Sequence, residues 1–521
     1  MTNVFELIAF ILYFVLVIGI GLYFFLKSKA TNEKDYFLGG RNMNGWVSAL
    51  SAGASDMSAW VLMGLPGSIF LYGLGQIWIS IGLVIGTILA WIFVAPVLRR
   101  YAIAAGDSIT LPQFLSNRFK SQSSVMRITC AIIFLVGYLL YSASSIFACG
   151  QLFHTLIPSI SQTLAMGVSA VIILIYTLLG GFNAVCWTDF FQGMLMLTAL
   201  MIVPIVAFIA LKSTGAIGTV VTPEHYYSLL STGKFDYSSM ANIITGLGWG
   251  LGYFGMPHIL IRYMAVKSEK ELRKSQIIGS TWTALICLMA TLMALVGHEY
   301  LGDSLKAADK NLVFVTIVRG IFEHGGWALL GGLIISAIVA ASMSTADSQL
   351  LASSSSFASD IYKAKIKKDA TDKQMLNVGR ITVIIVTILA FVIALCVYLF
   401  NLGGIMELVS AAWSIFGAAF GPVILLSLYD RRLNYKGACA GIITGFVVSI
   451  LWMILFNFEY YGFTSVIFNT QIYEIVPGFI LGFIVAKVVS HATEAPSEEI
   501  TKIFDQVKKM GQEAKAELKN K

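Results

Sequence analysis

Charged residues are scarce in this chain of 521 residues. Asp, Glu, Lys and Arg together make up 12% of it, whereas 57% is hydrophobic and the mean hydropathy is +0.80. A soluble protein carries about twice that share of charge to stay dissolved. The shortage therefore argues against a soluble globular protein and predicts a chain that resides in a lipid bilayer.

Cysteine and histidine are also few, with six of each, and neither forms a ligand pattern. The chain has no CxxC pair, which argues against a disulfide framework or a zinc site, and no HExxH or similar metal spacing. The GxxxxGK[ST] phosphate loop is absent too, so ATP is not the expected energy source. We expect no enzymatic activity and no cofactor, because no nucleophile–base pair stands out.

Long apolar runs recur along the whole chain, several of them about 20 residues long and so able to cross the hydrocarbon layer as helices. Examples are 7–26, 77–98, 168–179, 194–211, 381–400 and 441–456. Backbone groups in lipid must be paired within the segment, and the runs lack the alternating polarity of barrel strands. The sequence therefore predicts an all-α integral membrane protein.

The basic residues indicate how the chain crosses the membrane. About 30 of the 35 Lys and Arg residues fall in alternate connections, which the positive-inside rule makes cytoplasmic. These connections are 27–41, 99–127, 262–274, 363–380, 431–436 and the tail from 487. Counting spans against them gives about thirteen, with the N-terminus outside and the C-terminus in the cytoplasm. The net charge of +7 then reflects topology, and no nucleic-acid partner is expected.

We expect one transmembrane domain over 1–490 and a charged, helical, solvated cytoplasmic tail over 491–521. Outer loops near 213–240 and 298–326 are long enough to form small lids. The chain also has glycines spaced four apart, such as Gly82 and Gly86, which we interpret as helix contacts. The motif Gly250-Leu-Gly252-Tyr-Phe-Gly255 matches GxGxxG but lies inside a span, with no strand before it, and is not a dinucleotide site.

Two spans are interrupted by Gly, Pro and small polar residues at membrane depth, over 48–67 and 246–257. Paired interrupted spans in corresponding halves of a chain indicate the midplane binding site of a transporter. They lie about five spans apart, which predicts two inverted repeats of five, roughly 47–212 and 239–430. The expected function is the transport of a small solute.

Asp56 is an ionisable residue in the middle of the first interrupted span, where burial costs at least about 2.5–3.5 kcal/mol. We interpret it as part of a cation site, because the unwound backbone beside it offers further oxygen ligands of the kind that sodium takes. The alternative is a buried carboxylate that pairs with backbone or a hydroxyl for structure alone.

A second polar group lies in the span around residue 345. Ser344, Asp347 and Ser348 have the i, i+3, i+4 spacing that puts them on one helix face, which suggests an ion path. Small-residue packing is the alternative. Asp189 stands at the cytoplasmic start of another span, where an ion site and a helix N-cap are equally good interpretations.

Aromatic side chains in the spans could form the walls of a solute pocket. Trp249 and Tyr253 are one turn apart within the second interrupted span, and Trp60 and Tyr141 are further candidates. Packing or an interfacial belt is the usual role of a single aromatic residue in a span.

With these residues in view, the sequence resembles the bacterial sodium/proline symporters of the solute:sodium symporter family over nearly its whole length. The motifs that carry the resemblance are Leu38-Gly-Gly-Arg41, Ser51-Ala-Gly-Ala-Ser-Asp-Met-Ser58, Gly64-Leu-Pro-Gly67, Leu179-Gly-Gly-Phe182, Gly248-Trp-Gly-Leu-Gly-Tyr-Phe-Gly255 with Pro257-His258, Met343-Ser-Thr345 and Gly417-Ala-Ala-Phe-Gly-Pro422.

The resemblance implies a LeuT-type five-plus-five inverted repeat with one extra helix before it and two after it, in a bacterial plasma membrane. It implies sodium as coupling ion and L-proline as solute. The implied sodium ligands are backbone oxygens of Ala54, Met57 and Ala341 and hydroxyls of Ser344 and Thr345, with Asp56 supporting them electrostatically. The implied proline site consists of Ser58, Trp60, Tyr141, Trp249, Tyr253 and Pro257.

Three positions depart from the pattern of the proline branch: Ala59 replaces a Gly, Met256 a Gln and Asp347 a Ser. Some sialic-acid transporters of the family have a second sodium site near the last position. By that likeness Asp189, Ser344, Asp347 and Ser348 are candidates for a second cation site. Another small amino or carboxylic acid as solute, or proton coupling, remains the alternative, and no residue pattern specifies an oligomeric state.

Overall fold

The computed structural model describes residues 4–27, 33–121, 123–179, 181–322 and 325–519, and helices dominate it. Within these ranges there is no strand, only an isolated pairing of Met43 with Val266. Helices satisfy their own backbone hydrogen bonds, which is the requirement that lipid imposes. The predicted all-α class is confirmed.

Ten helical segments in the described ranges are long and apolar enough to cross a membrane. Eight are the continuous helices α1 (Val4–Lys27), α8 (Val125–Leu156), α10 (Phe182–Thr214), α13 (Glu269–Leu301), α16 (Asp372–Phe400), α17 (Ile405–Tyr429), α18 (Tyr435–Phe456) and α19 (Ile475–Ala492). Two are joined helices: α5 (Ile77–Leu89) continues through η4 (Ala90–Val94) into α6 (Ala95–Ala104), and α15 (Trp327–Ser356) continues into η8 (Phe357–Ile366). The shorter α9 (Gln162–Leu179) and two interrupted spans bring the number to the predicted thirteen, a count that stays a prediction.

The two interrupted spans lie where the Gly and Pro residues predict them. The first consists of α3 (Gly45–Asp56), η2 (Trp60–Gly64) and α4 (Leu65–Tyr72), and the second of α11 (Tyr237–Gly248), η5 (Trp249–Phe254) and α12 (Pro257–Ala265). Asn44 caps the start of α3 by accepting the Val47 N–H at 3.0 Å. A proline in the first turn of α4 and of α12 restarts the helix after each break.

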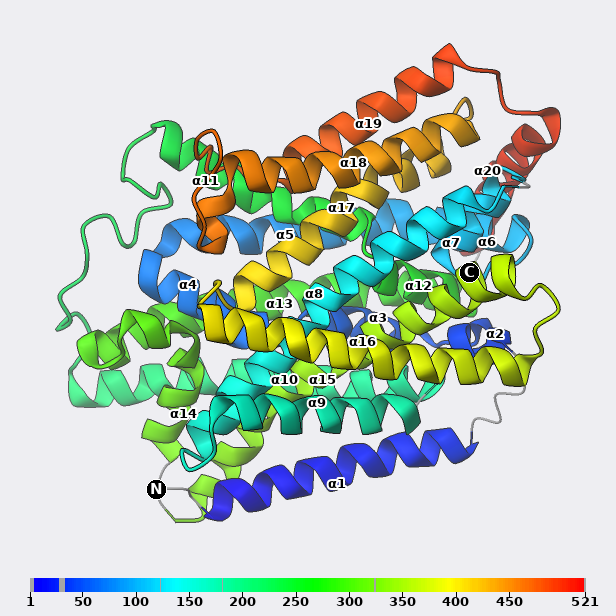
Figure 1. Cartoon of the computed structure of the whole chain (residues 1–521). Coiled ribbons are helices and arrows are strands. Elements are labelled where there is room, and N and C mark those ends of the chain that lie inside the picture. The colour runs from blue at the N-terminus through cyan, green and yellow to red at the C-terminus, as the bar shows by residue number, and fades with distance from the viewer. Residues whose placement is uncertain (1–3, 28–32, 122, 180, 323–324, 520–521) are drawn as a thin grey trace.

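The helices run side by side in a bundle whose centre is α15 and α17, both almost wholly enclosed by other helices. Figure 1 shows α1 along one edge and α18 with α19 along the opposite edge. Exposed aliphatic side chains, such as Val15 on α1 and Ile484 on α19, cover these outer helices. The helices α4, α11 and α14 (Val313–Phe322) lie toward one end of the bundle, and α2 (Glu33–Leu38), α7 (Leu111–Arg118) and α20 (Glu498–Lys519) lie toward the other.

Glycines allow α5 to approach the second interrupted span closely. A Cβ added at Gly86 would lie 2.6 Å from the Gly250 Cα atom, and one at Gly82 would lie 2.8 Å from Leu247 Cα. The added Cβ would meet backbone atoms at both points, and no flexible side chain could move aside to make room for it. The interpretation of this glycine pair as a helix contact is confirmed.

The C-terminal tail is helical as predicted, but the expectation that it is solvated is wrong for one of its faces. Helix α20 packs along α6: the Phe504 ring lies 6.3 Å from that of Tyr101, and Val507 is buried. Lys120 also pairs with Glu499 at 2.7 Å. An apolar stripe at helical spacing, hidden among the charges of the tail, explains the docking.

Candidate functional site

The first interrupted span loses its helical backbone at Met57, where φ is −79° and ψ is 71°. Beyond that point the Ser58 N–H donates to the Asp56 carbonyl at 2.9 Å rather than to Ala54, its partner in a continuous helix. The Ala54 carbonyl is thus free to accept from another element.

The freed Ala54 carbonyl faces α15. It accepts hydrogen bonds from the Ser344 hydroxyl at 2.9 Å and from the Thr345 hydroxyl at 3.4 Å. The Ser344 hydroxyl also lies 3.1 Å from the Ala341 carbonyl. Four predicted sodium ligands therefore lie together as buried oxygens, the ligand type that hard cations prefer. Met57, the fifth, belongs to the adjoining unwound turn.

The Asp56 carboxylate contacts the second interrupted span. Its Oδ2 accepts the Tyr253 hydroxyl at 2.5 Å, and the residue is 1% exposed. With Thr87 and Tyr263 it lines a cavity of about 10 Å³, which is room for roughly one water. No Lys, Arg or His in the described ranges forms an ion pair with Asp56, and its Oδ1 atom is buried without a hydrogen-bond partner there.

The predicted solute residues gather around the same break. The Asp56 carbonyl accepts the Tyr141 hydroxyl at 2.8 Å and the Trp60 indole N–H at 3.3 Å. The Trp60 and Trp249 rings lie 5.9 Å apart, and all of these side chains are buried. Ser58 accepts the Trp60 backbone N–H at 3.4 Å, and Pro257 begins α12 just beyond η5. Ser58 and Pro257 are buried as well.

Trp413 on α17 belongs to this aromatic group, although no sequence pattern predicts it. Its indole N–H donates to the Trp249 carbonyl at 2.7 Å, and its ring lies 5.3 Å from Tyr253. A single tryptophan in an apolar span has no sequence pattern that marks it as part of a binding site. Only the neighbouring Gly417–Pro422 motif pointed to that helix.

The second polar group is also assembled, but around an arginine. Arg262 on α12 donates to the Asp189 carboxylate at 2.8 Å, to the Ser348 hydroxyl at 2.6 Å and to the Ser51 hydroxyl at 2.6 Å. The Asp347 carboxylate accepts the Ser348 hydroxyl at 3.3 Å. Arg262 thus forms an ion pair with Asp189, and Asp347 joins the group through Ser348; all of these residues are deeply buried.

Two interpretations of this group are corrected by the structure. Asp189 lies inside α10, whose N-cap is Gly181, so it is not a capping residue. The charge pattern places Arg262 in a cytoplasmic connection, but the structure has it buried within α12. The Ser344 hydroxyl bonds to the carbonyls of Ala54 and Ala341, and its part in a second cation site stays a prediction.

The two polar groups are neighbours along the same helix pair. Ser51 and Ala54 are one turn apart on α3, and Ser344 and Ser348 are one turn apart on α15. One turn rises about 5.4 Å, so the oxygen cluster and the arginine cluster are adjacent layers of one interface.

Arg41 joins several elements by hydrogen bonds at the end of the bundle where α2 and α7 lie. Its guanidinium donates to the carbonyls of Met264 at 2.7 Å and Ser108 at 2.6 Å and to the Asp107 carboxylate at 2.8 Å. Partial burial raises the pKa of Asp107, but hydrogen bonds from Lys34 and Arg41 lower it by more, so it lies below its usual value. Arg41 thereby ties the end of α12 to the α6–α7 connection.

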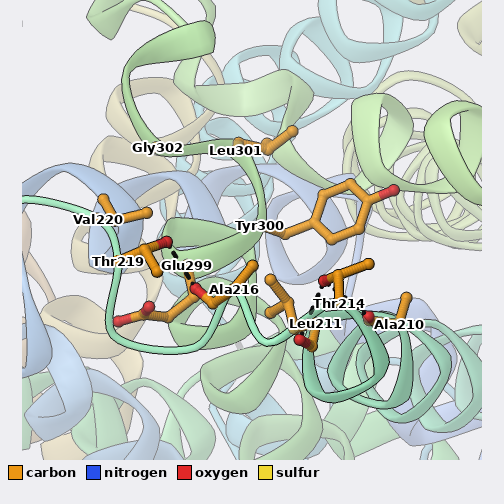
Figure 2. Close-up of a pocket in the computed structure, with 10 residues that line it drawn as sticks. All are labelled: Ala210, Leu211, Thr214, Ala216, Thr219, Val220, Glu299, Tyr300, Leu301 and Gly302. Carbon is orange, nitrogen blue, oxygen red and sulfur yellow. Dashed lines mark hydrogen bonds between the residues drawn. The ribbon is translucent and has the colours of Figure 1, made fainter.

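A separate pocket of about 380 Å³ opens at the other end of the bundle, where the two predicted lid loops meet (Figure 2). It is lined by the ends of α10 and α13 and by the loop after Gly215. Glu299 accepts the Tyr227 hydroxyl at 2.5 Å and the Gly218 N–H at 2.9 Å, which holds the loops together. The pocket shares no residue with the aromatic group.

Two helices interrupted in corresponding halves, with an oxygen cluster and an enclosed aromatic group at the breaks, define an ion-coupled secondary carrier. Comparison with known proteins then fixes the family. Residues 36–445 match the Sodium:solute symporter family, and the chain belongs to that family.

Relatives match along nearly the whole chain. The osmoregulated proline transporter OpuE of Bacillus subtilis is 37% identical, over 96% of this chain and 97% of its own. The high-affinity proline transporter PutP of the same species is 41% identical, over 92% and 97%. Among solved structures, a Na+-coupled sialic acid symporter covers 96% of this chain and 100% of its own with a TM-score of 0.74 at 19% identity, a likeness of fold.

Proposed function

We propose that this protein imports L-proline together with sodium by alternating access. Two relatives that match almost end to end are named as proline transporters, and the family couples solute movement to sodium. The observation that carries the proposal is the contact of the Ser344 hydroxyl with the freed Ala54 carbonyl at 2.9 Å. It joins an interrupted helix to α15 through oxygens alone.

In this mechanism sodium binds between α3 and α15, at the oxygens of Ala54, Met57, Ala341, Ser344 and Thr345. The ion takes the place of the direct hydrogen bonds between the hydroxyls and the Ala54 carbonyl. Because it binds oxygens of both α3 and α15, it holds these two helices together. Asp56 supplies a negative charge nearby and, through Tyr253, fixes η5. Binding of the ion thus orders both sides of the break, which also forms the solute site.

Proline is bound by the aromatic group and Ser58. Trp60, Tyr141, Trp249 and Tyr253 provide apolar faces for the pyrrolidine ring. The unwound turn after Asp56 exposes backbone groups that can pair with the amino acid's carboxylate and amine. Ala59 and Met256, which depart from the pattern of the proline branch, adjoin Ser58, Trp60 and Pro257 of this site, and we expect the solute preference to be sensitive to substitution there.

One sodium ion supplies enough energy for uptake. Moving one charge through ~100 mV releases about 2.3 kcal/mol, and a tenfold sodium gradient adds ~1.4 kcal/mol. The membrane potential alone then supports roughly 50-fold accumulation.

A second cation is the further part of the proposal, with Asp189, Ser344, Asp347 and Ser348 as its candidate ligands. The Asp347 Oδ2 atom supports it, because this atom is buried and accepts no hydrogen bond within the described residues. We expect Asp347→Asn to lower the number of sodium ions moved per solute. The control is Asp107→Asn, outside the cluster, which should leave that ratio unchanged. If Asp347→Asn also leaves the ratio unchanged, the proposed second cation site is refuted.

We further propose the topology and domain limits given by the charge pattern. The N-terminus is outside, the C-terminus and α20 are cytoplasmic, and the repeats span roughly 47–212 and 239–430 within one domain over 1–490. Each repeat range starts with an interrupted span and holds five spans, which supports the assignment. The exposed aliphatic surface of α1, α16, α18 and α19 contacts lipid in the bacterial plasma membrane.

Binding by the purified protein tests the solute. Labelled L-proline is titrated with and without sodium, and a panel of small amino and carboxylic acids competes. Saturable proline binding that requires sodium is expected. Stronger competition by another acid would replace proline with that solute, and binding that depends on pH but not on sodium would favour proton coupling.

A further inference from the structure

The loop between α18 and α19, residues 457–474, is a folded element and not a simple connection. Its middle returns to the end of α18, where the Ile467 N–H donates to the Leu455 carbonyl at 2.9 Å and the Thr470 N–H to the Phe456 carbonyl at 2.8 Å. We call this segment the α18–α19 loop. It lies outside both repeats.

A buried carboxylate holds the end of the loop in place. Glu474 is fully buried, and its two oxygens accept the Tyr461 hydroxyl at 2.5 Å and the Asn457 amide at 2.9 Å. The Tyr461 hydroxyl lies 3.3 Å from that of Ser410 on α17. The two ends of the loop are therefore fastened to each other and to the central helix.

The loop is hydrogen-bonded to α11, the outer half of the second interrupted span. The Tyr237 hydroxyl donates to the Thr470 carbonyl at 2.7 Å. The Thr245 hydroxyl donates to the Gln471 carbonyl at 2.9 Å and accepts the Tyr473 N–H at 3.0 Å. Three hydrogen bonds thus run along α11 toward the break, and each uses the loop backbone.

At the break, the Tyr473 ring stacks on Trp249. The ring centroids lie 5.2 Å apart with an interplanar angle of 29°, and the two residues are 3% and 2% exposed. The Tyr473 hydroxyl donates to the Ser410 carbonyl at 2.7 Å, which fixes the ring from its far side. Trp249 is thereby held between Tyr473 and Trp60, the latter a proposed solute residue.

We propose that Tyr473 is a positioning residue for the solute site: it sets the orientation of the Trp249 ring from outside the two repeats, while the α18–α19 loop clamps α11. The inference rests on the proposed function insofar as Trp249 contacts the solute. Because the ring is seated by stacking and the hydroxyl only anchors it, the aromatic face carries most of the effect.

The test compares three variants in purified protein. Tyr473→Ala removes ring and hydroxyl, and Tyr473→Phe keeps the ring. Phe463→Ala is the control, because Phe463 belongs to the same loop and its ring stacks on Phe458. At saturating sodium, Tyr473→Ala should weaken proline binding about two- to tenfold, the usual range for an aromatic pair. Tyr473→Phe should restore most of the affinity, and the maximal transport rate should change less than twofold.

A double-mutant cycle separates positioning from general damage. In a Trp249→Leu background, Tyr473→Ala should have less than a twofold further effect, because the ring that it orients is gone. Equal effects of Tyr473→Ala in both backgrounds, or equal losses in Tyr473→Ala and Phe463→Ala, would overturn the proposal.

Hydrogen exchange tests the clamp without any solute. Amides of Tyr237–Gly248 should exchange faster in Tyr473→Ala than in the wild type and remain unchanged in Phe463→Ala. If the wild-type protein binds no solute of the panel, the proposed function fails, yet faster exchange still supports the clamp. Unchanged exchange together with unchanged affinity in Tyr473→Ala contradicts both parts of the inference.

Discussion

The substitution Ser344→Ala removes the shortest contact between the first interrupted span and α15. The lost hydroxyl lies 2.9 Å from the Ala54 carbonyl, whereas that of Thr345 lies 3.4 Å from it. A polar contact with a charged group contributes about 1.5–3 kcal/mol, so the sodium concentration for half-maximal uptake should rise roughly 10- to 150-fold. Thr345→Ala should have a smaller effect, and the two together a larger one.

The assay is uptake of labelled proline into proteoliposomes across a range of sodium concentrations, followed by proline titration at saturating sodium. Proline affinity at saturating sodium should stay within about threefold of the wild type, since no hydroxyl of the pair belongs to the solute site. Loss of one neutral hydrogen bond costs about 1 kcal/mol of stability, so thermal unfolding of each variant is measured alongside.

Ser342→Ala is the matched control for this experiment. Ser342 is equally buried in the same helix, but its hydroxyl donates at 3.0 Å to Ile338 of its own helix. It should leave the sodium dependence unchanged. The reasoning would be refuted by full activity of Ser344→Ala at low sodium, or by a loss of proline affinity that persists at saturating sodium.

Three further outcomes follow from the contacts. Tyr253→Phe removes the 2.5 Å hydrogen bond to Asp56, and the sodium requirement should rise several-fold in ion titrations while the ring stays in place. Arg262→Met leaves Asp189 buried without its partner and should cost about 3–5 kcal/mol, seen as a lower unfolding temperature, with Arg262→Lys losing less. Gly86→Ala should lower that temperature by overpacking, since its Cβ would meet backbone, whereas Gly19→Ala, with open space around it, should not.

The interrupted helices could be located from the sequence because their signal is local. Gly and Pro residues among small polar ones mark where a helix cannot continue, and the breaks lie at Met57 and after Gly248 as the pattern indicates. The grouping of Ser344 and Thr345 with Ala54 came from the family resemblance, since residue spacing alone does not show which helices face each other.

Contacts that depend on three-dimensional packing could not be read in this way. Arg262 follows an apolar stretch at the start of a basic run, so its sequence context resembles a cytoplasmic connection, yet its guanidinium turns inward to Asp189. Trp413 and Tyr473 reach the aromatic group from helix α17 and from a loop beyond it. Neither carries a local pattern, because a buried tryptophan or tyrosine looks the same in sequence whether it packs or lines a site.

The central claim is that a sodium gradient drives proline uptake through this protein. Proteoliposomes with a high external sodium concentration, no proton gradient and no other energy source should accumulate labelled proline above its external concentration. Dissipating the sodium gradient with an ionophore should release it. Equal accumulation when potassium replaces sodium, or accumulation only when a proton gradient is imposed, would contradict the account.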